Sequence, residues 1–337
     1  MRAPDRPLHL AFLGCGRIAA KHRRTLAAVS PLVRCSFASR DASRASEYQR
    51  RYAGSTSWGS YAAAIEDPSV DLVMITTPTS SHLELALAAL EAGKDVIVEK
   101  PAFLRSEDVT TVEWAAATVG RCVFVAENYC YKPLAGALRQ LVESGELGEI
   151  RFVSVNALTR QEPGGWRNDL STAGGGALFE GGIHWIDLVA HLGLTVQSVE
   201  GFRPGGGDGI ERSIVVVLRY LEGAIGTLHH SWETPGRLRG LQLSRIAGTR
   251  GSATFESNGL FIQVHTPKRT RWIFPGFADI SGYHAMFADF LGAIDRGRDG
   301  GMTLARARRD LELVEEALDT SSQRHDRAQP FDLEVMP

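Results

Sequence analysis

The regular structure of the chain begins with Leu8-His9-Leu10-Ala11-Phe12-Leu13-Gly14-Cys15-Gly16-Arg17-Ile18-Ala19, a short apolar strand, a glycine-rich turn and the start of a helix. Gly14 permits a tight turn, Gly16 lets a pyrophosphate approach the backbone, and Ala19 lets the helix pack closely on the strand. The helix that opens at Arg17 and Ile18 offers free N–H groups to phosphate oxygens. Such a turn can also be purely structural, but its place between a strand and a helix favours dinucleotide binding.

Around this turn, the first 125 residues alternate short apolar strands with helical patterns. The predicted strands are 8–13, 33–38, 71–76, 95–99 and 122–126. The predicted helices are 18–28, 42–53, 61–65, 81–92 and 106–118. Alternation at this spacing implies right-handed crossovers, which produce a parallel sheet covered by helices on both faces. Residues 1–125 are therefore predicted to form a Rossmann dinucleotide-binding domain.

After residue 125 the pattern changes, because strands follow one another through short links that contain glycine. The predicted strands are 150–158, 198–203, 212–220, 224–232, 241–247, 251–256, 259–264 and 270–274. The predicted helices are 134–144, 182–192, 283–296 and 303–322. We therefore expect an α/β protein in which residues 126–337 form a second, α+β domain. Its large, mostly antiparallel sheet carries helices on one face.

Length and composition agree with a globular protein of two domains. The chain has 337 residues, of which 44% are hydrophobic and 23% charged. Its formal net charge of −2 indicates no nucleic-acid partner, and no apolar run reaches the roughly 20 residues that span a bilayer. The four cysteines have no metal-ligand spacing, so reduced thiols and no metal are expected. The polar N-terminus does not have the pattern of a signal peptide, which makes a cytoplasmic location the default expectation.

The second strand ends at Ser39-Arg40, where many dinucleotide-binding proteins have an acidic residue that binds the ribose. A small hydroxyl followed by a guanidinium suits a 2′-phosphate better than a 2′-hydroxyl, because arginine is a fork-shaped phosphate donor. NADP is therefore favoured mildly over NAD as the cofactor. The alternative is that Arg40 is a solvated surface charge and Ser39 only starts the next helix.

Two stretches contain groups that could move a proton during hydride transfer. Lys100 follows the strand 95–99 directly, which places it at the carboxyl edge of the predicted parallel sheet. In the second domain, Glu180, His184 and Asp187 are spaced four and three residues apart. On a helix these spacings share one face, so a carboxylate could orient or charge the imidazole. The alternatives are a solvated loop lysine and a histidine with only a structural hydrogen bond.

Taken together, these residues resemble the Gfo/Idh/MocA family, the glucose–fructose oxidoreductase, inositol dehydrogenase and rhizopine catabolism proteins. The resemblance covers nearly the whole chain. Its motifs are Gly14-x-Gly16-x-x-Ala19-x-x-His22, Thr77-Pro78-Thr79-x-x-His82, Glu99-Lys100-Pro101, Asn128-Tyr129-x-Tyr131-x-Pro133, Gly145-Glu146-Leu147-Gly148, Trp166-Arg167 and residues 174–187. The resemblance implies that residues 126–337 bind substrate and support oligomerisation. Their sheet is then open, and its exposed face packs against a second subunit, as a homodimer or homotetramer.

The resemblance also assigns roles to individual residues. It implies that Lys100 is the active-site lysine and that His184 transfers the proton. Glu180 stands where many relatives have the aspartate of a Lys–Asp–His set, and Thr79 stands where the usual residue is asparagine. The predicted cofactor-binding residues are Gly14, Gly16, Arg17, Ile18, Ala19, Ser39, Arg40, Thr77, Pro78, His82, Glu99 and Lys100. The predicted substrate-binding residues are Lys100, Asn128, Tyr131, Trp166, Arg167 and His184.

The expected activity is a reversible oxidation of a secondary hydroxyl on a sugar, cyclitol or related polyol, with hydride passing to or from NADP or NAD. His184 exchanges the hydroxyl proton, Lys100 hydrogen-bonds the reacting oxygen, and Glu180 positions the substrate or the imidazole. Two alternatives stay open. One is an NAD-dependent redox-type glycosidase. The other is a non-catalytic dinucleotide-sensing regulatory protein, which would have no need of Lys100 and His184.

Overall fold

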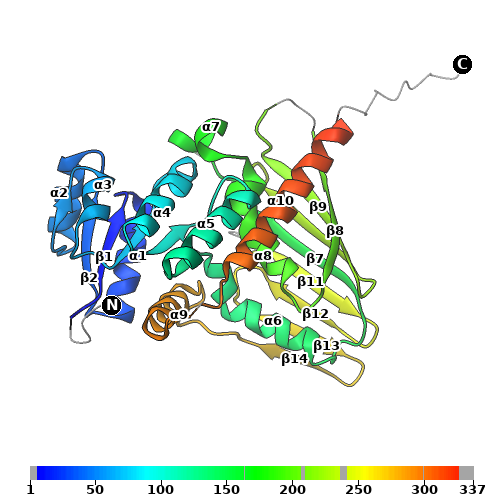
Figure 1. Ribbon diagram of the computed structural model, residues 1–337. Coiled ribbons are helices and arrows are strands. Elements are labelled where there is room, and N and C mark those ends of the chain that lie inside the picture. Colours follow the sequence, from blue (N-terminus) through cyan, green and yellow to red (C-terminus); the bar gives the residue numbers. More distant parts are fainter. Residues whose placement is uncertain (1–5, 163, 206–208, 236–240, 299, 326–337) are drawn as a thin grey trace, which may run out of the picture.

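A six-stranded parallel sheet forms the first half of the protein (Figure 1). The computed structural model describes residues 6–162, 164–205, 209–235, 241–298 and 300–325. The strand order is β3-β2-β1-β4-β5-β6, and every pair is parallel. The strands are β1 (His9–Leu13), β2 (Arg34–Ala38), β3 (Ser57–Trp58), β4 (Leu72–Ile75), β5 (Asp95–Glu99) and β6 (Val123–Ala126). The predicted Rossmann arrangement is confirmed, and β3 is a short edge strand that the sequence did not predict.

Helices connect these strands and bury them. The connecting helices are α1 (Arg17–Val29), α2 (Ala42–Arg51), α3 (Tyr61–Glu66), α4 (His82–Glu91) and α5 (Ser106–Val119). All residues of β1 and β4 are buried, as expected for central parallel strands with continuous apolar sequences. Because the crossovers run in one sense, the carboxyl ends of β1, β2, β4, β5 and β6 meet at one edge of the sheet. Ligands bind at this edge in open parallel sheets.

The second half contains an eight-stranded sheet with the order β14-β13-β12-β11-β7-β10-β9-β8. Its strands are β7 (Ile150–Leu158), β8 (Val196–Phe202), β9 (Ser213–Tyr220), β10 (Ile225–Ser231), β11 (Leu243–Gly248), β12 (Ser252–Glu256), β13 (Ile262–Thr266) and β14 (Arg269–Ile273). Among the described strands, β7 pairs with β10 in parallel and the other pairs are antiparallel. The predicted mostly antiparallel sheet is confirmed.

Helices lie over one face of this second sheet (Figure 1). They are α6 (Pro133–Glu143), α8 (Ile183–Ala190) and α10 (Leu304–His325), of which α10 packs along β8 and α8 contacts β7 and β10. Burial alternates along β9 and β10, which shows that one face of each strand meets this core and the other does not. The opposite face of the sheet is therefore left uncovered by the described helices of this chain.

The helix α9 (Tyr283–Arg296) returns from the second half of the chain to the first sheet. Its buried residues Met286, Phe287 and Phe290 join the apolar cluster that contains Phe12 of β1. The Phe290 ring stacks on Phe124 of β6 with a centroid separation of 4.9 Å. The chain after residue 125 thus helps to build the first core. The division into 1–125 and 126–337 stays a prediction.

Phe287→Ala is expected to lower the free energy of unfolding by about 3–5 kcal/mol, because it leaves a cavity where α9 meets the first core. Phe287 is fully buried and meets the His22 ring edge-on at 5.4 Å. Chemical denaturation followed by circular dichroism measures the change. The control Phe277→Ala removes a ring that is 62% exposed and should cost no more than about 0.5 kcal/mol. Equal losses in the two variants would contradict this packing role.

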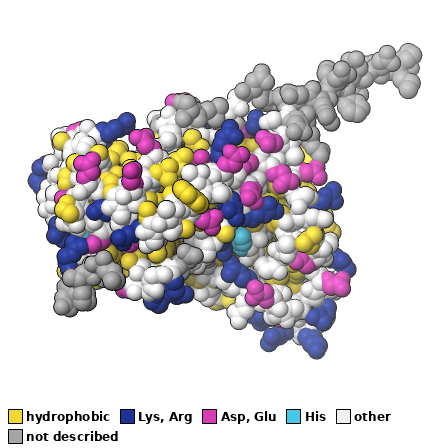
Figure 2. All heavy atoms as spheres, viewed as in Figure 1, with side chains coloured by type: hydrophobic (Ala, Val, Ile, Leu, Met, Phe, Trp, Pro, Cys, Tyr) yellow, Lys and Arg dark blue, Asp and Glu magenta, His cyan; other side chains and the backbone are white. Residues whose placement is uncertain are grey.

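The surface and the cysteines agree with the balanced composition. Acidic and basic side chains are interspersed over the face shown in Figure 2, with hydrophobic side chains between them. All four cysteines are free thiols; Cys15 and Cys35 are buried, whereas Cys122 and Cys130 are partly exposed. None of the described helices combines the length and apolarity needed to cross a lipid bilayer.

Candidate active site

A cleft of about 690 Å³ runs along the carboxyl edge of the first sheet. It is lined by the glycine turn after β1, by residues that follow β2, β4 and β5, and by residues of the second half of the chain. The predicted cofactor residues that line it are Gly14, Gly16, Arg17, Ile18, Ser39, Arg40, Thr77, Pro78, His82, Glu99 and Lys100. Ala19 is buried beneath the turn, where its small side chain lets α1 pack on the sheet.

The glycine turn has the backbone geometry that a pyrophosphate site needs. Gly14 has a φ of +110°, and a Cβ there would lie 2.9 Å from the carbonyl oxygen of Thr76, so only glycine fits. A Cβ on Gly16 would face open space in the cleft. No side chain in the described structure caps the start of α1, which leaves its first N–H groups available to an anion. These residues therefore fit a dinucleotide.

The end of β2 offers cations to a ribose or its phosphate. Arg40 and Arg44 both line the cleft, and Arg44 also donates from Nε to the carbonyl oxygen of Cys15 at 2.7 Å. Asp41, the acidic residue at this corner, caps α2. Its Oδ1 accepts from the N–H groups of Ser43 at 2.9 Å and Arg44 at 3.3 Å. Sequence reasoning missed Arg44, which lies one helical turn beyond Arg40.

Buried polar contacts hold the end of β5 against its neighbours. Glu99 forms an ion pair with His22 of α1. Burial raises the pKa of Glu99, but the neighbouring His22 and Lys100 outweigh it, and the pKa falls below its usual value. His82 contacts the carbonyl oxygens of Thr77 at 2.9 Å and Ala102 at 3.0 Å through its two ring nitrogens. These contacts fix the position of the next residue, Lys100.

The second half of the chain meets this edge at Lys100. The Lys100 Nζ donates to the carbonyl oxygen of Glu180 at 2.6 Å, and the Glu180 carboxylate accepts from Arg167 Nε at 2.8 Å. Burial raises the pKa of Glu180, but the nearby cations Lys100 and Arg167 lower it by more than burial raises it. The pKa of Glu180 is therefore below its usual value. Glu180 is therefore ionised at neutral pH and holds two cations together.

A second cleft, of about 560 Å³, opens from the first along the large sheet. The two clefts share Arg17, Lys100, Gly164, Arg167, Glu180 and His184. Lys100 from the first sheet and His184 from α8 thus lie at the junction of the two clefts. A dinucleotide in the first cleft and a small substrate in the second would meet at this junction.

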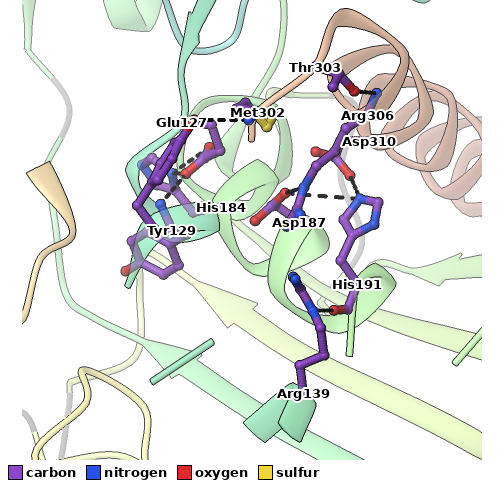
Figure 3. A network of polar contacts seen from close by, with 11 residues as sticks. Glu127, Tyr129, Arg139, His184, Asp187, His191, Met302, Thr303, Arg306 and Asp310 are labelled. Atoms are coloured by element: carbon purple, nitrogen blue, oxygen red, sulfur yellow. Dashed lines mark hydrogen bonds and ion pairs between the residues drawn. The ribbon is translucent and has the colours of Figure 1, made fainter. Parts of the chain in front are cut away.

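The imidazole of His184 is held by a carboxylate that the sequence did not predict (Figure 3). Its Nδ1 lies 2.6 Å and 2.7 Å from the two oxygens of the buried Glu127. The Tyr129 ring stacks on the imidazole at 4.6 Å with an interplanar angle of 13°. With Nδ1 engaged by Glu127, Nε2 of His184 is the nitrogen left for a substrate.

Glu180 and Asp187 make their hydrogen bonds to other residues, although the charges of Glu180 and His184 interact, so a role of Glu180 at the imidazole stays a prediction. Leu178–Gly182 forms a turn of π-helix, in which residues four apart do not stack as they do in an α-helix. Glu180 faces Arg167 instead, and Asp187 Oδ1 accepts from Arg306 Nε at 2.6 Å. A register argument could have found the true partner. Glu99 pairs with Ala126 across β5 and β6, which places Lys100 and Glu127 side by side.

The other predicted substrate residues divide into three groups. Arg167 lines both clefts. Asn128 and Tyr131 lie outside both linings. Asn128 donates to the carbonyl oxygen of Ser281 at 2.6 Å, and the Tyr131 hydroxyl donates to Asp289 at 2.8 Å, so both hold α9 and the segment before it in place. The side chain of Trp166 lies outside the described part of the structure.

His230 of β10 is a pocket residue that sequence reasoning missed. It lines the second cleft beside Trp185 and Trp232. Burial lowers the pKa of His230 to about 4, so the ring is neutral, and backbone hydrogen bonds with Ala177 and Ala157 hold it in place. Buried aromatic rings beside a fixed, neutral imidazole suit a polyhydroxylated ring as ligand.

Comparison with known proteins agrees with this geometry. Residues 8–127 match the family described as "Oxidoreductase family, NAD-binding Rossmann fold", and residues 136–254 match the GFO/IDH/MocA C-terminal domain. The two matches together cover most of the chain and define an oxidoreductase with a nucleotide-binding domain. The chain belongs to the Gfo/Idh/MocA family, and it is an NAD(P)-dependent oxidoreductase.

Individual relatives match at modest identity. Levoglucosan dehydrogenase of Pseudarthrobacter phenanthrenivorans is 27% identical over 286 residues, which are 74% of this chain and 73% of that protein. The scyllo-inositol 2-dehydrogenase (NADP(+)) of Bacillus subtilis is 34% identical over 128 residues, 37% of this chain and 36% of that protein. A solved levoglucosan dehydrogenase in complex with NADH and levoglucosan superposes with a TM-score of 0.82 at 24% identity, covering 94% of this chain and 98% of the other. That likeness shows the shared fold.

Proposed function

We propose that the protein catalyses the reversible oxidation of a secondary hydroxyl on a sugar, cyclitol or related polyol, with hydride passing to or from a nicotinamide. The observation that carries this proposal is the convergence of Lys100, which follows β5, and His184, from α8, on the junction of the two clefts. The relatives named for levoglucosan and scyllo-inositol support a polyhydroxylated ring as the substrate class. The aromatic and polar lining of the second cleft supports it independently.

The residues of the junction supply the proton chemistry. His184 Nε2 takes the proton of the substrate hydroxyl, and the Glu127 carboxylate on Nδ1 stabilises the imidazolium that forms. Lys100 donates to the reacting oxygen and stabilises its developing negative charge. Glu180 holds Lys100 and Arg167 in place through its carbonyl and its carboxylate. When bound, the oxidised nicotinamide accepts the hydride from the carbon that carries the hydroxyl.

Titration with NADP+ and NAD+, followed by a panel of sugars and polyols, tests this function. Levoglucosan, myo-inositol and free aldoses are the first compounds of the panel, and nicotinamide absorbance is the readout. Net formation of reduced nicotinamide with a free polyol is the expected result. Cleavage of a glycoside without net reduction would indicate the redox-type glycosidase instead. Cofactor binding without turnover of any member of the panel would favour the dinucleotide sensor.

We propose further that the cofactor is NADP rather than NAD. Arg40, Asp41 and Arg44 all line the ribose end of the cleft, and the carboxylate of Asp41 also accepts the N–H groups that cap α2. Two guanidinium groups suit a 2′-phosphate, because each donates charge-assisted hydrogen bonds to phosphate oxygens.

Arg40→Asp is expected to weaken NADP+ binding by about 10-fold to 100-fold, since it removes a charged hydrogen bond and adds a repulsive charge. NAD+ binding should change much less. Fluorescence titration with both dinucleotides measures the two dissociation constants. The control Arg51→Asp changes an exposed arginine near the end of α2 that lies outside the cleft lining, and it should leave both constants nearly unchanged. Equal weakening of NADP+ and NAD+ by Arg40→Asp would contradict a 2′-phosphate contact.

The uncovered face of the large sheet is the proposed oligomer interface. Phe152 of β7 and Trp272 of β14 are 63% and 53% exposed, and register places them on the same face as the exposed Leu243 of β11. A face with several large exposed apolar side chains favours burial against a second copy.

Phe152→Glu is expected to shift the protein toward the monomer, because it places a charge in this apolar contact. Light scattering coupled to size-exclusion chromatography measures the mass. The control Leu32→Glu changes an apolar residue between α1 and β2 that is 79% exposed, and it should leave the mass unchanged. A Phe152→Glu protein that keeps the mass of the unmodified protein would contradict this interface.

A further inference from the structure

A buried cluster of titratable groups lies behind His184, on the side of α8 that faces α10 (Figure 3). Asp187 and Asp310 are fully buried, and Arg306 Nε donates to Asp187 Oδ1 at 2.6 Å. His191 Nε2 lies 2.9 Å from Asp310 Oδ1. The Arg139 Nε of α6 donates to the His191 carbonyl oxygen at 2.9 Å, which fixes the turn that carries His191. Nothing in the proton chemistry proposed above uses these groups.

The charges of the cluster indicate that Asp310 carries a proton. Two ionised carboxylates and one guanidinium would leave a buried net charge of −1, which is costly. Burial raises the pKa of Asp310 well above its usual value, Asp187 and Glu127 raise it further, and Arg306 opposes them. Burial and Arg306 together lower the pKa of His191 to about 4. A neutral carboxyl group therefore lies between a neutral imidazole and the Asp187 carboxylate at neutral pH.

A metal ion fits this cluster less well than a proton does. One ligand atom each from Asp187, His191 and Asp310 lie within 4.8 Å of one another. Arg306 already neutralises Asp187, so a divalent cation would leave an excess positive charge in a buried place. One proton balances the cluster.

A small cavity connects this cluster to the active site. The cavity measures about 10 Å³, and both Glu127 and Asp310 line it, together with Lys100 and Met302. That is about the space of a single water molecule, and two carboxyl groups provide polar partners for one. Asp310 also has a side-chain hydrogen bond with Asp187, so its carboxyl group is held in place beside the cavity from two sides.

We propose that the proton taken from the substrate leaves inward, from His184 through Glu127 and this cavity to Asp310 and His191, and from there to solvent. This inference rests on the proposed function. The His184 Nδ1 proton passes to Glu127, and a water molecule in the cavity relays it to the Asp310 carboxyl group. Asp310 in turn gives a proton to His191 Nε2, and His191 releases one from Nδ1. Each group ends with the number of protons with which it began, but both imidazoles end as the opposite tautomer. Once the product has left, exchange of ring protons with solvent restores Nδ1–H on His184 and on His191.

The proton is expected to move inward because bound ligands would block its route to solvent through the clefts. Substrate and dinucleotide would fill the two clefts in front of His184 during turnover. The His191 side chain is 24% exposed and is the outer end of the path. Asp310, in the middle, is faced by Asp187, Arg306, Glu127 and His191, so its proton is held by contacts from α8, α10 and the end of β6. It acts through other groups and is a positioning residue in the reaction.

Infrared spectroscopy tests the outer half of the path without any substrate. Burial raises the pKa of Glu211 to about 7, so mildly alkaline buffer is used to keep this second buried carboxyl group ionised. Under these conditions the full-length protein should show a protonated-carboxyl band, and Asp310→Asn should remove it. On transfer to D2O this band should shift within the mixing time, and His191→Phe should delay the shift. Absence of an Asp310 band, or a band that exchanges over hours in the unmodified protein, would overturn the path.

Single-turnover kinetics tests the inner half, with NADP+ and levoglucosan or myo-inositol as probes. Asp310→Asn and His191→Phe should slow proton release to a pH-indicator dye by about tenfold, while hydride transfer in the first turnover changes much less. Asp319→Asn, an exposed carboxylate on the same helix α10 that does not line the cavity, is the control. Proton release that keeps pace with hydride transfer in both variants would overturn the proposal. If neither probe is oxidised, the substrate assignment fails, and the infrared result still decides the path.

Discussion

Lys100→Met is expected to lower kcat by about 10³-fold, a typical loss for a group that moves or stabilises charge in the reaction. Methionine keeps the length and most of the volume of the side chain but has no charge and no N–H. The variant loses the donor at 2.6 Å from the Glu180 carbonyl oxygen and the cation that faces the reacting oxygen. The glycine turn is untouched, so NADP+ should still bind with nearly its normal affinity.

In the Lys100→Met variant, steady-state kinetics measures the loss of kcat, and nicotinamide fluorescence measures the affinity for NADP+. Lys268→Met, in the link between β13 and β14, removes a lysine far from the cleft and should leave kcat and dinucleotide binding unchanged. Because Lys100 also lines the small cavity near Asp310, the folded state should be checked by thermal denaturation. A folded Lys100→Met protein that retains most of its kcat would show that Lys100 does not stabilise the reacting oxygen.

His184→Asn is expected to lower kcat by about 10²-fold to 10⁴-fold, because it removes the group that takes the hydroxyl proton. Asparagine keeps a polar side chain near Glu127 but cannot act as a base. The remaining rate should rise with pH, since hydroxide then replaces the imidazole.

Glu127→Gln tests the same proton transfer with a smaller change, because it leaves His184 in place and alters only its partner. It keeps a hydrogen-bond acceptor at 2.6 Å from His184 Nδ1 but removes the charge that stabilises the imidazolium. We expect a smaller loss of kcat and a pH–rate profile that is displaced from that of the unmodified enzyme. If His184→Asn and the unmodified enzyme had the same kcat and the same pH profile, His184 would not be the proton acceptor.

The sequence predicted both sheets because their signals are local. Continuous apolar strands alternate with helices in the first half, and strands linked by glycine-containing turns follow one another in the second. The return of α9 to the first core was not predictable in this way. Its apolar residues Met286, Phe287 and Phe290 show that one face is buried, but a periodicity does not say against what.

The candidate site was predictable where a motif places a residue at a strand end. Lys100 and the glycine turn are of this kind. The hydrogen-bond partner of His184 was not predicted, because the spacing of Glu180 and His184 was interpreted on an α-helix and the chain forms a π-helical turn there. Glu127 follows β6 and His230 lies on β10, and only the pairing of the strands places Glu127 beside Lys100 and His230 in the second cleft.

A crystal structure of the complex with NADP+ tests the central claim most directly. We predict that the pyrophosphate lies on the turn from Gly14 to Ala19 and the 2′-phosphate near Arg40. The nicotinamide ring should lie at the junction of the clefts, with its C4 facing a space between Lys100 and His184 that brings a substrate carbon within about 3–4 Å. A ring that lies outside this junction, with Lys100 or His184 out of reach of any substrate on its C4, would contradict the mechanism.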